Sequence, residues 1–319
     1  MANQRLGIAA TAAVPAAGRL RETAPTSSWA KARERLAWMF VAPAILVVII
    51  VAIYPLIRTF QLSFTNARLG AATETRWIGL DNYTRLWRDD QFWESLKNTI
   101  VFTVAAVGFE TLLGMIIALT IHSNFKGRGL VRTSMLVPWA IPTVVSAQMW
   151  KWMYHDVFGV VNDFFGKKLN FMDPDTALLA NTSTSLPAII AVDVWKTTPF
   201  MALLLLAGLQ IIPGDIYESS NIDGASKVRQ FVDMTLPLLK PALLVALIFR
   251  TMDSFRVFDV IYVMKATAAD TMSIAIYAQN LLVREQRLGR GSAAAVVIFL
   301  IIAAFVVIYT RLVKVEEMA

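Results

Sequence analysis

Residues 36–57 read LAWMFVAPAILVVIIVAIYPLI, an apolar stretch without a charged side chain. A helix needs about 20 mostly apolar residues to cross the hydrocarbon core of a bilayer, so this stretch is long enough to span a membrane. The whole chain of 319 residues is 56% hydrophobic, more than is typical of soluble globular domains. Its apolar residues are gathered in long blocks, and the sequence therefore predicts a membrane protein.

Five more apolar blocks follow the first one along the chain. Together the blocks predict an all-α, polytopic membrane protein with six transmembrane helices. The third block is interrupted by Pro138 and Pro142, which cannot donate a backbone hydrogen bond within a helix. The predicted spans cover residues 36–57, 99–121, 130–154, 186–212, 242–264 and 292–313.

A polar, Ala-rich leader, residues 1–35, precedes the first span. The leader is too long, and the apolar block behind it too extended, for a cleaved signal peptide. Lys and Arg are enriched in cytoplasmic segments of membrane proteins, and they are more numerous on the leader's side than on the opposite side. We therefore predict a cytoplasmic leader, a transmembrane domain over residues 36–319 and both termini in the cytoplasm.

The composition argues against several functions. The absence of Cys removes disulfides, thiolate catalysis and Cys-based zinc sites. His122 and His155 are the two His residues, and the predicted topology separates them by a bilayer, so neither a metal cluster nor a Ser/His/Asp site is predicted. The basic residues behind the net charge of +7 are divided among short loops, unlike the basic stripe of a nucleic-acid-binding protein. We predict no catalytic residue, no metal site and no nucleic-acid partner, with membrane lipid around the spans.

The loop between the fourth and fifth spans, residues 213–241, reads PGDIYESSNIDGASKVRQFVDMTLPLLKP. Asp215 is placed to cap a first short helix, and Glu218 three residues later would complete a capping box. Gly224 permits a sharp bend, because glycine tolerates backbone angles that other residues avoid. A second helix is predicted over residues 225–236. The loop is therefore expected to form a bent helical hairpin.

Two prolines, Pro237 and Pro241, are expected to end the second helix of this hairpin. A structured and partly apolar hairpin between two spans has the form of an element that lies in the groove of a partner protein. Apolar residues recur at roughly helical spacing along both arms, namely Ile216, Tyr217, Ala225, Val228, Phe231 and Val232.

This hairpin resembles the EAA motif of the permease subunits of bacterial ATP-binding-cassette (ABC) importers. In that family Glu-Ala-Ala is followed by Gly at a fixed spacing and then by Ile-x-Leu-Pro. The matching stretches here are ESSNIDG at residues 218–224 and MTLP at residues 234–237. The chain departs from the pattern with Ser219 and Ser220 in place of the two Ala and with Met234 in place of Ile.

Other stretches resemble the carbohydrate-importing, maltose-permease branch of the same family. They are WIGLDNY at residues 77–83, RGLVR at residues 128–132 with the following Pro138, and FMALLLLAGLQ at residues 200–210. The likeness extends over residues 36–313, nearly everything beyond the leader. Within this branch, permeases of trehalose importers look most similar to the chain as a whole.

The resemblance implies that the hairpin docks into a cleft of a nucleotide-binding subunit and transmits the closure of that subunit. Glu218 would then meet a basic residue of the partner, a role compatible with its place in a capping box. Gly224 would form the bend. The residues implied in ATPase coupling are Glu218, Ser219, Ser220, Asp223, Gly224 and Pro237.

The resemblance also implies the partners and the location of this chain. They are a second homologous permease subunit, two ATP-binding-cassette ATPase subunits and an extracytoplasmic sugar-binding protein, assembled at a bacterial inner membrane. Gly166-Lys167-Lys168 is not a Walker A motif, because the upstream Gly at the required spacing and the Ser or Thr are missing. ATP and Mg²⁺ are therefore expected on the partner ATPase, with no cofactor in this chain, which is not expected to be an enzyme.

Ionisable residues inside the predicted spans mark candidate functional positions, because charge is costly there. Asp193 and Lys196 lie three residues apart in the fourth span, and so do Arg250 and Asp253 in the fifth, so each pair can neutralise itself along one helix face. At a rise of about 1.5 Å per residue, the two pairs lie at similar depth. They are either solute ligands or structural salt bridges. Glu110 in the second span is expected to form hydrogen bonds between helices.

A sugar needs polar groups along its path, because each hydroxyl stripped of water must find a partner. The resemblance carries the sugar-lining positions of the related maltose permease onto one face of each of two helices in this chain. The residue types differ from those of the relative, so the binding chemistry is not transferred. Phe200 either stacks on a sugar ring or packs against neighbouring helices. The two sets are Asp193, Lys196, Thr197 and Phe200, and Arg250, Asp253, Ser254 and Val257.

We therefore predict a permease subunit that forms half of the translocation pathway of an ABC importer for a sugar, a disaccharide such as trehalose, driven by a partner ATPase. The alternative is a stand-alone secondary transporter. That alternative would require ion-coupled uptake without an ATPase and would leave the hairpin around Gly224 without a role.

Overall fold

The computed structural model describes three ranges of the chain, residues 28–70, 74–169 and 176–312. Most of the predicted leader, residues 1–27, and the last residue of the predicted sixth span, Val313, lie outside the described residues. Within the described ranges the structure is helical, and its β pairing is an isolated antiparallel bridge between Thr65 and Trp77. The all-α prediction is confirmed. The chain divides into two compact units, Met1–Leu56 and Ile57–Ala319.

The described chain begins with one continuous helical stretch. α1 (Ser28–Val48) runs through a π-helical turn, η1 (Ile49–Ile53), into α2 (Tyr54–Ser63). Pro55 has no N–H for the carbonyl four residues back, and the wider π turn directly before it accommodates the proline ring. The stretch Lys31–Ser63 is long and apolar enough to cross a membrane, in agreement with the predicted first span.

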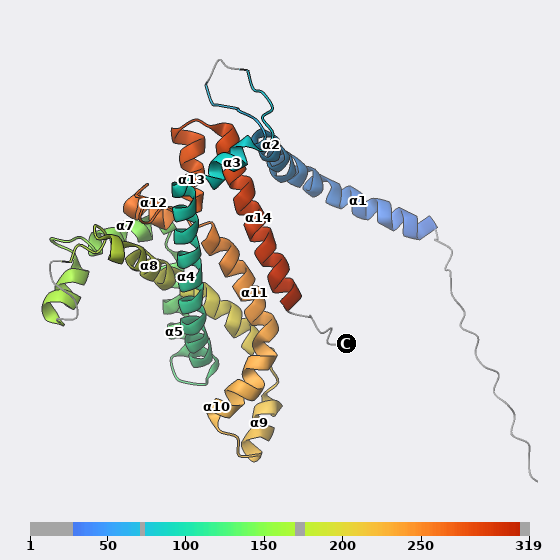
Figure 1. The fold of residues 1–319 in the computed structure, drawn as a ribbon. Coiled ribbons are helices and arrows are strands. Elements are labelled where there is room, and N and C mark those ends of the chain that lie inside the picture. Colours follow the sequence, from blue (N-terminus) through green and yellow to red (C-terminus); the bar gives the residue numbers. More distant parts are fainter. Residues whose placement is uncertain (1–27, 71–73, 170–175, 313–319) are drawn as a thin grey trace, which may run out of the picture. The chain divides into compact units, whose positions relative to one another are not determined.

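Three long helices form the centre of the second unit, α4 (Asp90–His122), α8 (Thr182–Leu209) and α11 (Leu236–Phe255). α4 and α8 cross in close contact, and α11 packs against both (Figure 1). A small residue permits the close approach of α8 and α11, because a Cβ added to Gly208 would lie 2.4 Å from the Cβ of Ala242. One group of buried apolar side chains holds the three helices together: Ala118, Ile121, Met201, Leu205, Leu206, Leu209, Leu239 and Ala246.

The predicted third span is a bent pair of helical segments and not one straight helix. α5 (Arg128–Met135) and α6 (Val137–Ala140) meet α7 (Thr143–Met153) at an angle of 90°. Pro138 lies in the first turn of α6, and Pro142 precedes the first residue of α7, so the two prolines set the break. Five helical stretches of the described chain are long and apolar enough to cross a membrane, or six if this pair counts as one span, which is compatible with the six-span prediction.

The predicted fifth span is also interrupted. α11 ends at Phe255, and α12 (Asp259–Lys265) begins after a break in which Phe258 has φ −135° and ψ −65°. The second, fourth and sixth predicted spans correspond to α4, α8 and α14 (Leu288–Leu312). α4 begins nine residues before the predicted second span, and the other ends of these helices differ from the predictions by one to four residues. The breaks at the third and fifth spans place irregular backbone near the predicted pathway residues, because residues beside both breaks line the same cavity as those positions.

Shorter elements lie at the two ends of the second unit. At one end, α9 (Gly214–Ile222), α10 (Lys227–Gln230) and the π-helical turn η3 (Phe231–Thr235) form the hairpin (Figure 1). At the other end lie α3 (Asp81–Trp87) and α13 (Ile274–Gln279) (Figure 1). The π-helical turns η2 (Asn162–Lys168) and η4 (Asn280–Arg284) complete the described elements. The predicted hairpin is therefore a separate structural element at one end of the bundle.

Candidate solute pathway and coupling hairpin

A cavity of about 580 Å³ is lined by residues of α6, α7, α8, α11, α12 and the break between α11 and α12. The two predicted sets of pathway positions come from α8 and from the end of α11. The structure brings the two helix faces together around this one cavity, because α8 and α11 pack side by side. All eight predicted positions line it: Asp193, Lys196, Thr197, Phe200, Arg250, Asp253, Ser254 and Val257.

Arg250 of α11 joins three helices through its guanidinium group. Its Nε donates to Oε2 of Glu110 at 2.6 Å and its Nη2 donates to Oε1 at 2.8 Å, a bidentate pair with α4. Its Nη1 donates to Oδ2 of Asp253 at 2.6 Å, and Nη2 lies 3.5 Å from Oδ2 of Asp193 on α8. Bidentate Arg–carboxylate pairs combine strength with a fixed geometry, so the arrangement orients the groups around it.

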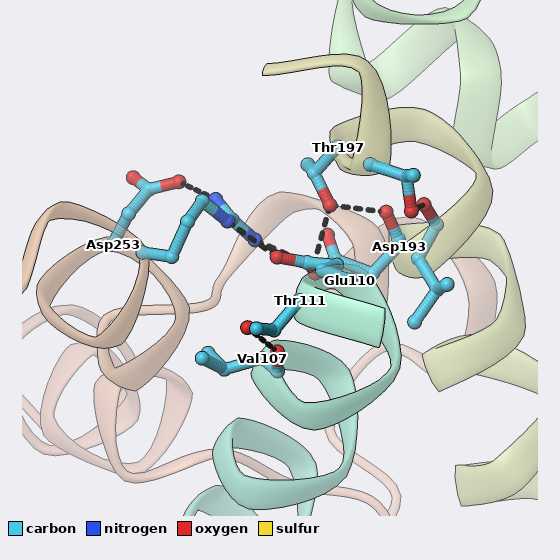
Figure 2. Close-up of polar contacts among 9 residues, drawn as sticks. Val107, Glu110, Thr111, Asp193, Thr197 and Asp253 are labelled. Atoms are coloured by element: carbon cyan, nitrogen blue, oxygen red, sulfur yellow. Dashed lines mark hydrogen bonds and ion pairs between the residues drawn. The ribbon is translucent and has the colours of Figure 1, made fainter. Parts of the chain in front are cut away.

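The members of this cluster differ in their exposure. The side chain of Glu110 is 0% exposed and that of Arg250 is 3% exposed, whereas the side chain of Asp253 is 69% exposed. The hydroxyl of Thr197 on α8 donates to Oε1 of Glu110 at 2.6 Å, and Figure 2 shows Glu110 between Thr197 and Asp253. Glu110 thus bonds to both α8 and α11, and the prediction that it forms hydrogen bonds between helices is confirmed.

Of the two predicted charge pairs, one forms and one does not. Arg250 and Asp253 are paired along one helix face as predicted. Asp193 faces Arg250 and not Lys196, because the packing of α11 against α8 brings a guanidinium donor to it. Nζ of Lys196 lies 3.5 Å from the carbonyl oxygen of Trp139, and among the described residues no carboxylate lies within 4.0 Å of it.

An aromatic pair forms another part of the cavity wall. The ring of Phe200 stacks on that of Trp139, with centroids 6.0 Å apart and an interplanar angle of 13°. Phe200 therefore packs against a neighbour, and its role toward a solute stays a prediction. Trp139 was not predicted as a pathway residue. The available signal was an aromatic between Pro138 and Pro142, two residues that break the third span.

In residues 28–70, 74–169 and 176–312, no three His, Asp or Glu side chains are grouped so as to hold a metal ion. The carboxylates that do converge, those of Glu110, Asp193 and Asp253, converge on a guanidinium. The cavity offers donors and acceptors for hydrogen bonds together with an aromatic face, which suits a ligand that is both polar and partly apolar.

The bend of the hairpin forms where the sequence predicts it. Gly224 has φ +72°, a left-handed conformation that glycine adopts without steric cost. The capping box predicted at the start of the first arm does not form. α9 begins at Gly214 with Pro213 as its N-cap residue, and Asp215 lies in the first turn, where its charge favours the positive end of the helix. Glu218 is exposed one turn further along.

The prediction that two prolines end the second arm is wrong. The arm begins after Ser226, whose hydroxyl accepts a hydrogen bond from the N–H of Arg229 at 3.3 Å. It continues through the π turn η3 into α11, past both Pro237 and Pro241. Pro237 lies in the first turn of α11, directly after a wider π turn that accommodates its ring, so the helix is not broken.

Polar side chains join the two arms of the hairpin. The hydroxyls of Tyr217 and Thr235 are 3.0 Å apart, and Nε2 of the buried Gln230 donates to Oδ1 of Asn221 at 2.7 Å. On the outer surface, Ile222 is 87% exposed. Of the six predicted coupling positions, Ser220 is buried and the others are exposed, namely Glu218, Ser219, Asp223, Gly224 and Pro237.

Residues 110–315 match the family model described as "Binding-protein-dependent transport system inner membrane component". This segment begins at Glu110 of the buried cluster and contains the cavity and the hairpin. The chain belongs to this family. The family assignment agrees with the resemblance drawn from the hairpin sequence, and it sets aside the alternative of a stand-alone secondary transporter.

Named relatives of this transport-system component are permeases. The chain is 40% identical over 284 residues to the trehalose/maltose transport system permease protein MalF of Thermococcus litoralis, an alignment that covers 88% of this chain and 95% of the relative. It is 38% identical over 281 residues to the trehalose transport system permease protein SugA of Mycobacterium tuberculosis, with 88% and 89% covered. As predicted, the chain is a permease and not an enzyme.

A solved structure shares the fold of this permease. It is a bacterial alginate ABC transporter in complex with an alginate pentasaccharide-bound periplasmic protein, and one of its chains matches with a TM-score of 0.79 at 22% sequence identity. The match covers 91% of this chain and 98% of the other. At this level of identity the likeness concerns the fold, and the helical arrangement described above is therefore that of an ABC transporter permease in the membrane.

Proposed function

We propose that this permease forms half of the translocation pathway for a disaccharide, with trehalose as the first candidate. Two relatives support the solute class, because their names describe trehalose/maltose and trehalose transport and they are 40% and 38% identical to this chain. Both alignments extend over 88% of the chain, so they include the helices that line the cavity.

The observation that carries this proposal is the composition of the cavity wall. Asp253 presents an exposed carboxylate, Lys196 an ammonium group and Thr197 a hydroxyl to the same cavity. Sugar hydroxyls that lose water need such partners, and the apolar face of a sugar ring needs an aromatic surface such as that of Trp139 and Phe200. The cavity volume of about 580 Å³ falls within the range of ligand pockets, roughly 300–1,000 Å³.

The hairpin is proposed to be the coupling element that receives the motion of a partner ATPase. Its exposed surface combines acidic side chains, Glu218 and Asp223, with the apolar side chains of Ile222 and Val228. An apolar centre with charged groups around it is typical of an element that docks into a partner's groove. The complex would contain a second homologous permease, two ATPase subunits that hold ATP and Mg²⁺, and an extracytoplasmic sugar-binding protein.

The proposal also includes the orientation of the chain, with both termini and the hairpin in the cytoplasm of a bacterial cell. Lys227, Arg229 and Lys240 lie in or near the hairpin, as the enrichment of basic residues in cytoplasmic segments predicts. The opposite end of the second unit, with α3 and α13, would then face the sugar-binding protein.

The test uses the assembled transporter in proteoliposomes with ATP in the compartment that the hairpin faces. ATP hydrolysis and uptake of radiolabelled trehalose, maltose and sucrose are measured with and without the sugar-binding protein. We expect one disaccharide, trehalose first, to stimulate hydrolysis and to accumulate against its gradient. Stimulation by a monosaccharide or an amino acid alone, with none of the disaccharides transported, would overturn the proposal.

A further inference from the structure

The buried carboxylate of Glu110 has a role that the predicted pathway positions do not include. Glu110 lies on α4, is fully buried and does not line the cavity. It contacts Arg250 and Thr197, both of which do line the cavity. We propose that Glu110 is a positioning residue of the solute pathway. Through Arg250 it holds the carboxylate of Asp253 on the cavity wall, and it orients the hydroxyl of Thr197 directly. This inference rests on the proposed disaccharide transport.

The planar guanidinium group of Arg250 links Glu110 to Asp253. A guanidinium is planar, so two hydrogen bonds from its Nε and Nη2 to one carboxylate fix the direction of the remaining Nη1. Here the bonds to Glu110 measure 2.6 and 2.8 Å, and Nη1 of Arg250 donates to Oδ2 of Asp253 at 2.6 Å. The position of the Asp253 carboxylate is therefore set from α4 indirectly, through Arg250.

The two ends of this chain of hydrogen bonds, Glu110 and Asp253, differ in their exposure. Glu110 is 0% exposed and does not line the cavity, and Arg250 lines it with a side chain that is 3% exposed, so the pair offers a solute little surface of its own. Asp253 is 69% exposed, and it is Oδ2 that accepts the hydrogen bond from Arg250, which leaves its second oxygen, Oδ1, for other donors. The buried pair thus holds a carboxylate oxygen toward the cavity, where it can accept hydrogen bonds from sugar hydroxyls.

Thr197 is the second residue that Glu110 positions. Its Oγ1 lies 2.6 Å from Oε1 of Glu110 and 2.5 Å from the carbonyl oxygen of Asp193. Both neighbours are acceptors, so the single hydroxyl proton is shared between them and the oxygen lone pairs are left for the cavity. Figure 2 shows the hydroxyl of Thr197 between Asp193 and Glu110. Glu110 thereby orients two acceptors toward the same solute, the hydroxyl oxygen of Thr197 on α8 and the carboxylate oxygen of Asp253 on α11.

The first test is a double-mutant cycle on trehalose transport by the assembled complex, with Glu110→Gln and Asp253→Asn alone and together. If Glu110 acts through the position of Asp253, each single variant lowers transport about tenfold and the double variant stays within about threefold of the singles. Independent effects would multiply to a loss of about a hundredfold, and that result would overturn the inference. Thr198→Val is the control, since this buried hydroxyl bonds within its own helix to the carbonyl oxygen of Val194 at 2.6 Å, and it should leave transport within about twofold.

The second test exchanges the two charges in Glu110→Arg combined with Arg250→Glu. A pair that served only to hold α4 and α11 together would be restored by the exchange, with assembly and transport both recovered. In the proposed role the exchange places a carboxylate beside Asp253, so assembly recovers and transport stays at least about tenfold below the wild type. Recovery of both would overturn the inference, and the double-mutant cycle decides the matter where the exchanged variant does not assemble.

Failure of this inference can be told from failure of the proposed function. A wild-type complex that transports no disaccharide contradicts the proposed function. A wild-type complex that transports trehalose, together with variants of Glu110 and Asp253 whose effects multiply, contradicts only the positioning role.

Discussion

Gly114 of α4 lies against Met201 of α8 so closely that a Cβ added to the glycine would be 2.7 Å from Cγ and 3.1 Å from Cβ of the methionine. The same added atom would lie 3.2 Å from the backbone nitrogen of Ala202. Helices in membranes associate through such small residues, because lipid removes the hydrophobic driving force between them and leaves close packing. The contact between α4 and α8 places Glu110, one turn before Gly114, within reach of Thr197.

Gly114→Ala is therefore expected to destabilise the permease, by about 1 to 3 kcal/mol for an overpacked contact. Gly108→Ala is the matched control on the same helix, because nothing lies within 4 Å of a Cβ added there. The thermal transition of the purified protein in detergent measures both changes. Gly114→Ala should cost less in a Met201→Ala background than in the wild type, because the close contact with Cγ is then absent. An equal effect of the two glycine substitutions would contradict the packing argument.

Arg250→Met should destabilise the chain strongly, because it leaves Glu110 as a buried carboxylate without its bidentate partner. Removing one partner of a buried ion pair costs about 3 to 5 kcal/mol. Arg229 offers the comparison, since its pair with Asp233 at 3.2 Å is largely exposed. Arg229→Met is expected to change stability by less than about 1 kcal/mol. Similar thermal shifts for the two variants would argue against the buried cluster.

Gly224→Asp should uncouple the permease from its ATPase. The residue has φ +72°, so a side chain strains the bend, and the added charge alters the exposed tip of the hairpin. We expect sugar-stimulated ATP hydrolysis to fall at least about tenfold while the permease still inserts in the membrane. Gly79→Asp, at a glycine with φ +59° near α3, serves as the control for backbone strain alone. Retained transport in the Gly224 variant would contradict the coupling role.

The absence of Cys in the natural sequence permits a direct test of orientation. Val228→Cys in the hairpin and Arg85→Cys in α3 each introduce a single thiol at an exposed position. A membrane-impermeant maleimide is expected to label Arg85→Cys in intact cells and Val228→Cys only after permeabilisation. Labelling in the reverse order would place the hairpin outside the cell and refute the proposed coupling to a cytoplasmic ATPase.

Loosening the hairpin should be visible without any partner. Gln230 is buried and bonds to Asn221 at 2.7 Å and to the carbonyl oxygen of Ala225 at 3.3 Å. Gln230→Ala removes both bonds, which is expected to cost about 1 to 3 kcal/mol locally. Hydrogen exchange of the amides in α9 should become faster, whereas exchange in α4 should not change. Unchanged exchange in α9 would show that this contact does not hold the two arms together.

The sequence alone predicted the class of fold and the elements that identify the family. Long apolar blocks require lipid, and the left-handed angle at Gly224 matches the break expected from a glycine between two helical segments. The resemblance to the maltose-permease branch implied eight pathway positions, and their spacing of three and four residues places each set on one side of a helix. These are local properties, which a short window of sequence contains.

The partners of the charged side chains depended on tertiary structure. Arg250 pairs with Glu110 at a separation of 140 residues and with Asp193 at a separation of 57, so spacing within one helix could not identify these contacts. For the same reason, spacing allowed a pair of Asp193 with Lys196, whereas the structure pairs Asp193 with Arg250. The continuation of α11 past Pro237 depended on the π turn before it, a backbone adjustment that the proline rule does not include. Which charges meet inside the bundle is decided by the packing of α4, α8 and α11, since ion pairing depends on distance in space and not on order in the chain.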